Sequence, residues 1–295
     1  MKARLSLLIL PAILLFGSCE KNVSFKLKDA TAKLVVEASI ENGQAPTVVL
    51  SNSLDYFSSI SPEILEKSFV HGADISISNG TLTHQMKEYQ YTQNGYTFSY
   101  YSIDSSNLAI AFTGELNTSY SLSVKANGQE VHATTTIPGV TKKVDSLFWK
   151  RASEFLPDSV VALMITATDP PGYGDYVRYF TKDNSDPFYP GINSVFDDQI
   201  IDGTTYTLQV DRGYPRNLGL TKDDLVYFHK GDTVTFKLCN IDKATFDFWR
   251  TMEFAYASVG NPFSSPTKVI SNISGNGLGY FAGYAAQYHT LIIPK

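Results

Sequence analysis

The chain has 295 residues, with 24 basic against 29 acidic side chains and a formal net charge of −5 at pH 7. This acidic balance excludes a nucleic-acid binder, because binding to phosphates requires a basic face. The length is sufficient for one large hydrophobic core or two ordinary ones. The 18 Tyr and 18 Phe residues favour β-structure, where aromatic side chains pack well on a pleated surface.

The first residues have the pattern of an export signal. Two basic residues precede the apolar run Leu5–Phe16, which is too short for a bilayer core of ~30 Å that needs about 20 helical residues. The run ends in Phe-Gly-Ser-Cys at 16–19. This stretch resembles the lipobox of bacterial lipoproteins, with Phe16 in place of the usual Leu-like residue. We therefore predict a lipoprotein signal peptide over 1–18 and lipid attachment at Cys19; the alternative is an ordinary signal with a chance cysteine.

The lipobox resemblance implies a diacylglycerol on the sulfur of Cys19 and a third acyl chain on its amino group. Two chains already suffice for stable anchoring to a lipid bilayer. Residues 19–33 are polar and patternless, and we interpret them as a tether. The other cysteine, Cys239, then has no partner within the chain, so we expect a small buried hydrophobe and no disulfide.

Residues 34–138 contain short predicted strands with frequent turn signals, which is typical of an immunoglobulin-like β-sandwich. Asn-Gly at 127–128 predicts a type I′ hairpin turn. Ser61 and Pro62 predict the start of a short helix. The predicted strands of this first domain cover 34–40, 47–50, 73–78, 120–126 and 129–137.

Residues 140–295 are predicted to form a second, β-rich domain with one substantial helix over about 242–259. Asp242 is its expected N-cap. Apolar residues at three- and four-residue spacing predict its core-facing stripe: Phe246, Trp249, Met252, Tyr256 and Val259. The predicted strands cover 144–149, 159–168, 175–181, 204–210, 233–239 and a last one through 291–293. The fold class is therefore all-β (mainly).

The sequence contains no motif of an assignable reaction, so we predict no catalytic residue, no metal site and no cofactor. None of the five histidines lies four residues from another, and no Gly-x-Ser-x-Gly or phosphate-binding glycine loop occurs. A predicted long loop over 183–202 is rich in aspartate, and we expect these carboxylates to be solvated and not to bind a cation. Its acidic residues are Asp183, Asp186, Asp197, Asp198 and Asp202.

A glycine-aromatic segment at 277–284 has two interpretations. Glycine weakens a strand unless a bend or a close backbone approach requires it, so the segment is a bent strand packed under the predicted helix. Alternatively it is a binding edge that displays aromatic side chains. On the second interpretation, the candidate interface or ligand-binding residues are Phe263, Tyr280, Phe281 and Tyr284.

Four stretches together resemble the outer-membrane lipoproteins of Bacteroidota described as "domain of unknown function 4249". They are Leu34–Ile40, Gly231–Phe236, Asp242–Trp249, and the Asn-Pro-Phe at 261–263 through Tyr284. The resemblance covers nearly the whole chain after Cys19. It implies a lipid-anchored outer-membrane protein, often encoded beside a TonB-dependent transporter, and it carries over no catalytic residue.

Three functions remain open. The first is a non-catalytic binding accessory of a TonB-dependent outer-membrane transporter, which captures or gates a nutrient. The second is a structural or adhesive cell-envelope protein without a small-molecule ligand. The third is a glycan-active enzyme, which a deep pocket with two carboxylates ~5–10 Å apart would favour.

Overall fold

The computed structural model describes residues 32–54, 60–215, 226–259, 261, 265 and 267–295. The predicted signal peptide, the predicted lipid-attachment residue Cys19, most of the tether and the candidate interface residue Phe263 lie outside these residues. Among the helices that are described, none combines the length and apolar composition needed to cross a membrane.

The first half of the described chain is mainly β-structure, as predicted. Asn127 and Gly128, with φ of 52° and 72°, join β6 to β7 as the predicted hairpin turn. The short helix begins after Ser61, whose side chain accepts the N–H of Ile64. The elements are β1 (Leu34–Glu41), β2 (Thr47–Asn52), α2 (Pro62–Ser68), β3 (Asp74–Ser78), β4 (Thr83–Gln93), β5 (Tyr96–Ile103), η2 (Leu108–Ile110), β6 (Thr118–Ala126) and β7 (Gln129–Ile137).

The second half adds eight strands and the one substantial helix, so the predicted fold class is confirmed. The elements are β8 (Lys143–Arg151), β9 (Val160–Thr168), β10 (Tyr176–Asp183), β11 (Tyr189–Phe196), β12 (Thr205–Val210), β13 (Phe228–His229), β14 (Thr233–Ile241), α3 (Lys243–Ala257) and β15 (Leu278–Ile292). The strand β11 lies inside the stretch predicted as a long loop. Its Pro190 and Gly191 are turn-like residues that conceal a strand from sequence patterns.

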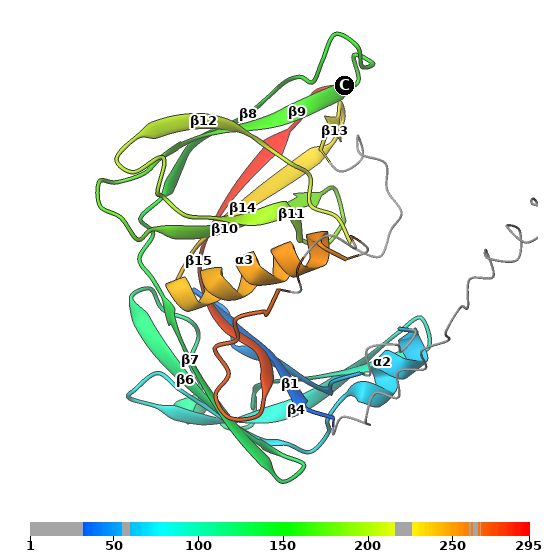
Figure 1. Cartoon of the computed structure of the whole chain (residues 1–295), viewed down its shortest axis with the longest axis vertical. Helices are drawn as coiled ribbons and strands as arrows, with labels where there is room; N and C mark the ends of the chain where they lie inside the picture. Colours follow the sequence, from blue (N-terminus) through cyan, green and yellow to red (C-terminus); the bar gives the residue numbers. More distant parts are fainter. Residues whose placement is uncertain (1–31, 55–59, 216–225, 260, 262–264, 266) are drawn as a thin grey trace, which may run out of the picture. The chain divides into compact units, whose positions relative to one another are not determined.

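Strand β15 connects the strands of the two halves (Figure 1). Residues 278–284 pair in parallel with β1, and residues 285–292 pair antiparallel with β14. One sheet of eleven strands results, in the order β11-β10-β14-β15-β1-β2-β5-β4-β3-β6-β7. Strands from both sides of the predicted boundary at 138–140 therefore belong to the same sheet. Residues 32–295 form one compact unit.

A second sheet is built from β8, β9, β12 and β13. It packs on the β10–β14 part of the large sheet, and a hydrophobic core that includes Val161, Leu163, Phe228 and Phe236 fills the space between them. The other large core lies among the strands of the first half and takes in Phe281 from β15. Both halves therefore have sandwich-like packing, which strands with alternating apolar and polar side chains favour.

The glycines of β15 allow other strands to approach its backbone closely. A Cβ on Gly283 would lie 2.5 Å from the carbonyl oxygen of Thr136 in β7. Gly279 has a φ of 105°, and a Cβ there would lie 1.9 Å from the carbonyl oxygen of Val36. Close backbone approach is thus the reason for this glycine-rich composition.

Helix α3 begins where the sequence predicts. The Asp242 side chain accepts the N–H of Thr245 and also the backbone N–H of Thr136 in β7. The cap therefore fixes the start of the helix and ties it to the first half of the chain at the same time.

The predicted core-facing stripe of α3 is only partly correct. Met252, Tyr256 and Val259 are exposed, with Val259 exposed by 80%. The buried positions of the helix are instead Thr245, Phe248 and Glu253. Polar Glu253 faces inward because Ser194 donates hydrogen bonds to its carboxylate, and apolar spacing alone cannot reveal such a position.

Candidate functional site

Strand β10 places two different surfaces on its two faces, because side chains of a strand alternate. Val177 and Tyr179 face a cleft between the two sheets, whereas Arg178 and Phe180 face a pocket beneath α3. An arginine flanked by apolar and aromatic residues in the first part of β10 is the feature of the sequence that could have marked this region.

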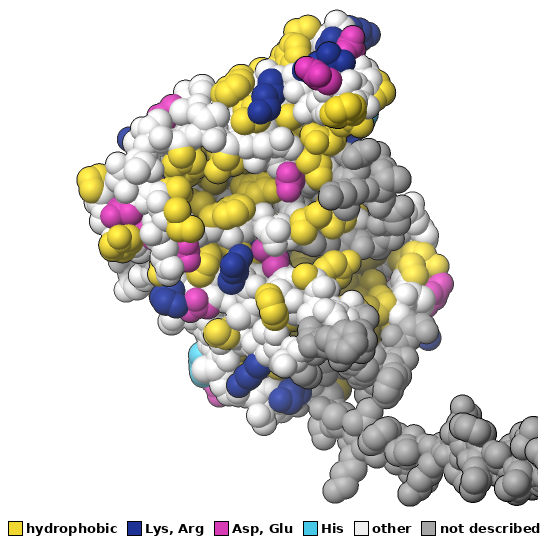
Figure 2. Space-filling view, turned by 45° about the horizontal axis from the view of Figure 1, so that its top comes forward, with side chains coloured by type: hydrophobic (Ala, Val, Ile, Leu, Met, Phe, Trp, Pro, Cys, Tyr) yellow, Lys and Arg dark blue, Asp and Glu magenta, His cyan; other side chains and the backbone are white. Residues whose placement is uncertain are grey.

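The cleft between the sheets, here the apolar cleft, is a cavity of about 510 Å³. Figure 2 shows apolar side chains gathered around a hollow on this face. This volume lies in the ordinary range of small-molecule sites, which are concave and mostly apolar. Its walls include Val177, Tyr179, Val195, Leu208, Phe236 and Leu238.

Few polar side chains line the apolar cleft. Burial raises the pKa of Asp211 above its ordinary value. Burial, with a smaller effect of the nearby Asp169 charge, raises the pKa of Tyr206 to about 12, so its hydroxyl stays protonated at neutral pH. Asp197 and Arg250 also line the cleft. The cleft thus offers a mainly apolar surface with a few groups that can orient a ligand.

The second cavity, here the Arg178 pocket, has a volume of about 440 Å³ and is rich in aromatic side chains. The guanidinium carbon of Arg178 lies 3.4 Å from the ring centroid of Trp249 and 4.7 Å from that of Phe180. Stacking on aromatic faces suits the planar guanidinium. Tyr280 and Tyr284 also line this pocket.

Buried polar groups hold Arg178 in place. Its Nε donates to the Ser194 hydroxyl at 3.2 Å, and its Nη1 donates to the Tyr284 hydroxyl at 3.0 Å. The carboxylate of Glu253 accepts both the hydroxyl and the backbone N–H of Ser194. Ser194 therefore bridges Arg178 and Glu253 by hydrogen bonds. This bridge brings two opposite charges near each other beside the pocket.

The predicted interface residues do not form a displayed edge. Phe281 is fully buried and Tyr284 is buried. The side of β15 left unpaired near Phe281 is covered by Asn272, whose amide group bonds both the N–H and the carbonyl of Phe281. The burial of Phe281 favours the packed-strand interpretation, and among the candidates that the structure describes, Tyr280 and Tyr284 line the Arg178 pocket.

The carboxylates of the predicted 183–202 loop have separate roles. Asp183 pairs with Arg212 at 2.8 Å. Asp202 accepts the N–H of Gly172, and Asp198 accepts the N–H groups of Gly174 and Asp175. Asp183 and Asp198 are therefore buried and Asp202 caps a turn, contrary to the expectation that all five acids are solvated.

Cys239 is buried and forms no disulfide in the described part of the chain, in line with its predicted role. Burial raises the pKa of its thiol to about 12, which makes it a neutral and unreactive group. It lies in a small core with Ile241 and Ala282 between α3 and the large sheet.

Comparison with curated proteins gives no match. A family model with the description "Domain of unknown function (DUF4249)" matches residues 20–289, which include the apolar cleft, the Arg178 pocket and all strands but the end of β15. The match covers far more than half of the chain and agrees with the resemblance seen in the sequence. The chain therefore belongs to the family described as domain of unknown function DUF4249.

Proposed function

We propose that this protein is a non-catalytic, lipid-anchored binding protein of the outer membrane that holds a small apolar ligand for a TonB-dependent transporter. The observation that carries the ligand-binding part is the apolar cleft, a cavity of about 510 Å³ that opens between the two sheets. A ligand that covers the apolar walls of this cleft removes their area from water, which favours binding of an apolar molecule.

The anchoring and partner parts of the proposal rest on the sequence. The lipobox-like stretch 16–19 supports acylation of Cys19, and the family match begins at residue 20, directly after it. The resemblance to outer-membrane lipoproteins supports a transporter as the partner. Confinement to the membrane plane would raise the effective concentration of the binding protein beside such a partner.

The ligand-binding part is tested with an uncharged apolar fluorescent dye, Nile red, titrated onto the folded protein. Leu208 lines the cleft, so Leu208→Lys places a charge in the apolar wall and is expected to weaken dye binding at least tenfold. Phe148→Lys is the matched control, because Phe148 has a similar exposure but lies on β8 outside the cleft.

Two results would contradict ligand binding in the cleft. One is the absence of saturable dye binding to the wild-type protein. The other is equal binding by the Leu208→Lys and Phe148→Lys variants when both melt like the parent protein.

The partner is tested by crosslinking in native membranes and identification of the captured proteins. Wild type is expected to capture a TonB-dependent transporter, and Cys19→Ala is expected to give an unlipidated precursor that captures none. Absence of a transporter with wild type would end the accessory proposal and favour the structural or adhesive alternative. Acyl chains on the Cys19→Ala variant would contradict the lipid-anchor prediction.

A further inference from the structure

A lysine and an aspartate are buried side by side next to the β8–β9 pair. Lys143 pairs with Thr168 in the register of these strands, so Lys142 and Asp169 occupy the next opposed positions. The Nζ atom of Lys142 lies 3.1 Å from Oδ1 of Asp169, and both side chains have an exposure of 0%. The ammonium and the carboxyl group are thus in contact and shielded from water.

The geometry of this contact is poor for a hydrogen bond. Within the described residues, neither Nζ of Lys142 nor either carboxyl oxygen of Asp169 has a hydrogen-bond partner, although the distance between Nζ and Oδ1 would permit one. A buried ion pair compensates for the loss of water only when good geometry and further hydrogen bonds satisfy both ions. The ionised forms of Lys142 and Asp169 are therefore poorly stabilised at this site.

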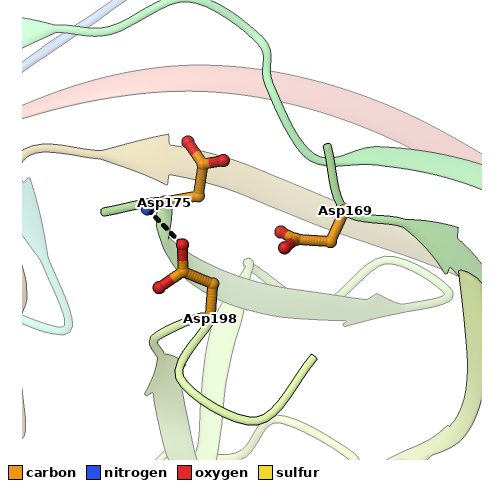
Figure 3. A group of neighbouring side chains, drawn as sticks. All are labelled: Asp169, Asp175 and Asp198. Carbon is orange, nitrogen blue, oxygen red and sulfur yellow. Dashed lines mark hydrogen bonds between the residues drawn. The ribbon is translucent and has the colours of Figure 1, made fainter. Parts of the chain in front are cut away.

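Two further carboxylates surround the pair. Oxygen atoms of Asp169, Asp175 and Asp198 all lie within 4.8 Å of one another, and Figure 3 shows the three side chains converging from separate segments. The Asp198 carboxylate accepts the backbone N–H groups of Gly174 and Asp175 at 2.7 and 2.9 Å. Lys142 forms its ion pair with Asp169, and the charge of Lys142 also contributes to lowering the pKa of Asp198.

The environments of two of these acids push their pKa values in opposite directions. Burial raises the pKa of Asp169, even though the nearby Lys142 charge acts against it. Burial would also raise the pKa of Asp198, but the N–H groups of Asp175 and Gly174 outweigh it and lower that pKa. A carboxyl group that tends to be protonated beside one that stays ionised is the arrangement of an acid and a base.

We propose that Lys142 and Asp169 form an intramolecular amide bond between Nζ and Cγ, with Asp198 as the group that transfers the proton. Cγ is bonded to Oδ1, which lies 3.1 Å from Nζ, so the amine and the carboxyl group that it would attack are held in contact. Exclusion of water from the site favours both the neutral amine as nucleophile and the loss of water as product.

The atoms of this step balance without a co-reactant. The Lys142 ammonium carries three protons, of which one remains on the amide nitrogen. Asp198 accepts one proton, which frees the nitrogen lone pair to attack Cγ of Asp169. The acid proton of Asp169 and one proton from the attacking nitrogen leave with one carboxyl oxygen of Asp169 as a water molecule, and Asp198 releases the proton that it accepted to solvent. The C–O bond breaks as the C–N amide bond forms, and no oxidant or reductant takes part.

The bond would tie the entry of β8 to the end of β9. Gln287 in β15 donates to the carbonyl oxygen of Lys142 at 2.6 Å, so the same residue is also attached to the large sheet. A covalent link across residues 142–169 restricts the unfolded chain and thereby stabilises the fold, as other cross-links do.

Peptide mapping of the mature protein, extracted from membranes and digested with trypsin under denaturing conditions, tests the proposal. The expected result is a branched peptide that contains both Lys142 and Asp169 and is lighter than the sum of its parts by one water molecule. Linear peptides with an unmodified Lys142 and an unmodified Asp169 would overturn the proposal, and this outcome requires no variant to fold.

Variants then identify the proton carrier. Asp198→Asn is expected to abolish the branched peptide, whereas Lys143→Met, which changes the exposed lysine next in sequence, is expected to keep it. Circular dichroism confirms that each variant is folded. A branched peptide at the wild-type level in Asp198→Asn would overturn the role of Asp198, and its persistence in Asp169→Ala would overturn the role of Asp169.

Discussion

Arg178 and Trp249 hold helix α3 against the large sheet. The guanidinium carbon lies 3.4 Å from the centre of the indole ring, and the arginine also bonds Tyr284 in β15 and Ser194 in β11. One buried cation on β10 therefore contacts two other strands and the helix. Trp249 is half-buried, whereas Met252 and Tyr256 of the same helix face are exposed. The stacking contact with Arg178 therefore distinguishes Trp249 from its neighbours and attaches the helix to the sheet.

Trp249→Ala is expected to lower the free energy of unfolding by about 3 kcal/mol, because it removes a large packed ring together with the surface on which Arg178 stacks. The measurement is urea unfolding monitored by far-UV circular dichroism. Phe155→Ala is the control, since Phe155 is 96% exposed and its loss should have little effect. Equal small losses in both variants would show that the helix does not depend on this contact.

Glu88 is expected to make stability depend on pH in the acid range. Burial would raise the pKa of its carboxyl group, but the N–H of Gly72, the hydroxyl of Ser99 and His71 outweigh burial and lower the pKa to about 2. Because the unfolded value is about 4.3, the stabilisation by Glu88 is complete above that pH and disappears as the pH falls through about 2.

Glu88→Gln should therefore destabilise the protein at pH 7 by about 1–3 kcal/mol, the range for hydrogen bonds to a charged group. The difference from wild type should shrink as the pH is lowered from neutral toward 2. Urea unfolding across this pH series measures it, with the exposed Glu154→Gln as control. A constant difference at every pH would mean that the ionisation of Glu88 is not the cause.

Gly283→Ala is expected to destabilise the fold more than Gly80→Ala. The new Cβ at 283 would lie 2.5 Å from a backbone oxygen of Thr136, and a backbone atom cannot move aside as a flexible side chain can. At Gly80 a Cβ meets nothing, and only the φ of 88° opposes the change, at a cost of about 1 kcal/mol. Thermal melts compare the two variants, and a smaller effect at 283 would refute the close approach of β7.

Cys239 is expected to resist thiol reagents at pH 8 in the folded protein, because burial raises its pKa to about 12 and blocks access. Ellman's reagent applied to the Cys19→Ala variant measures this one thiol, which should react only after urea is added. Reductant should leave the melting temperature of the protein unchanged. A clear drop with reductant would reveal a cross-link of Cys239 between chains.

The sequence was sufficient for features that depend on neighbours along the chain. Asn127-Gly128 determined the hairpin turn, because a type I′ turn requires the positive φ that both residues now show. Asp242 determined the start of α3 through its own side chain. Alternating apolar residues located most strands, and their abundance indicated the mainly β fold.

Other local signals were present but harder to interpret. Asn94-Gly95 joins β4 to β5 with φ of 53° and 84°, although no strand was predicted there. Both strands carry mostly polar or half-exposed side chains, so the apolar alternation that predicts a strand is weak. The Asn94-Gly95 pair was therefore the one local signal for this hairpin in the sequence.

Only the tertiary structure decided what lies opposite each strand. The sequence by itself indicated the class of fold, the Asn127-Gly128 turn and the cap of α3, and it predicts an anchor at Cys19. It could not show that β15 changes partner from β1 to β14, that Glu253 is buried on Ser194, or that Lys142 faces Asp169. These contacts join residues far apart in the chain, and their energies depend on burial and geometry that no local pattern encodes.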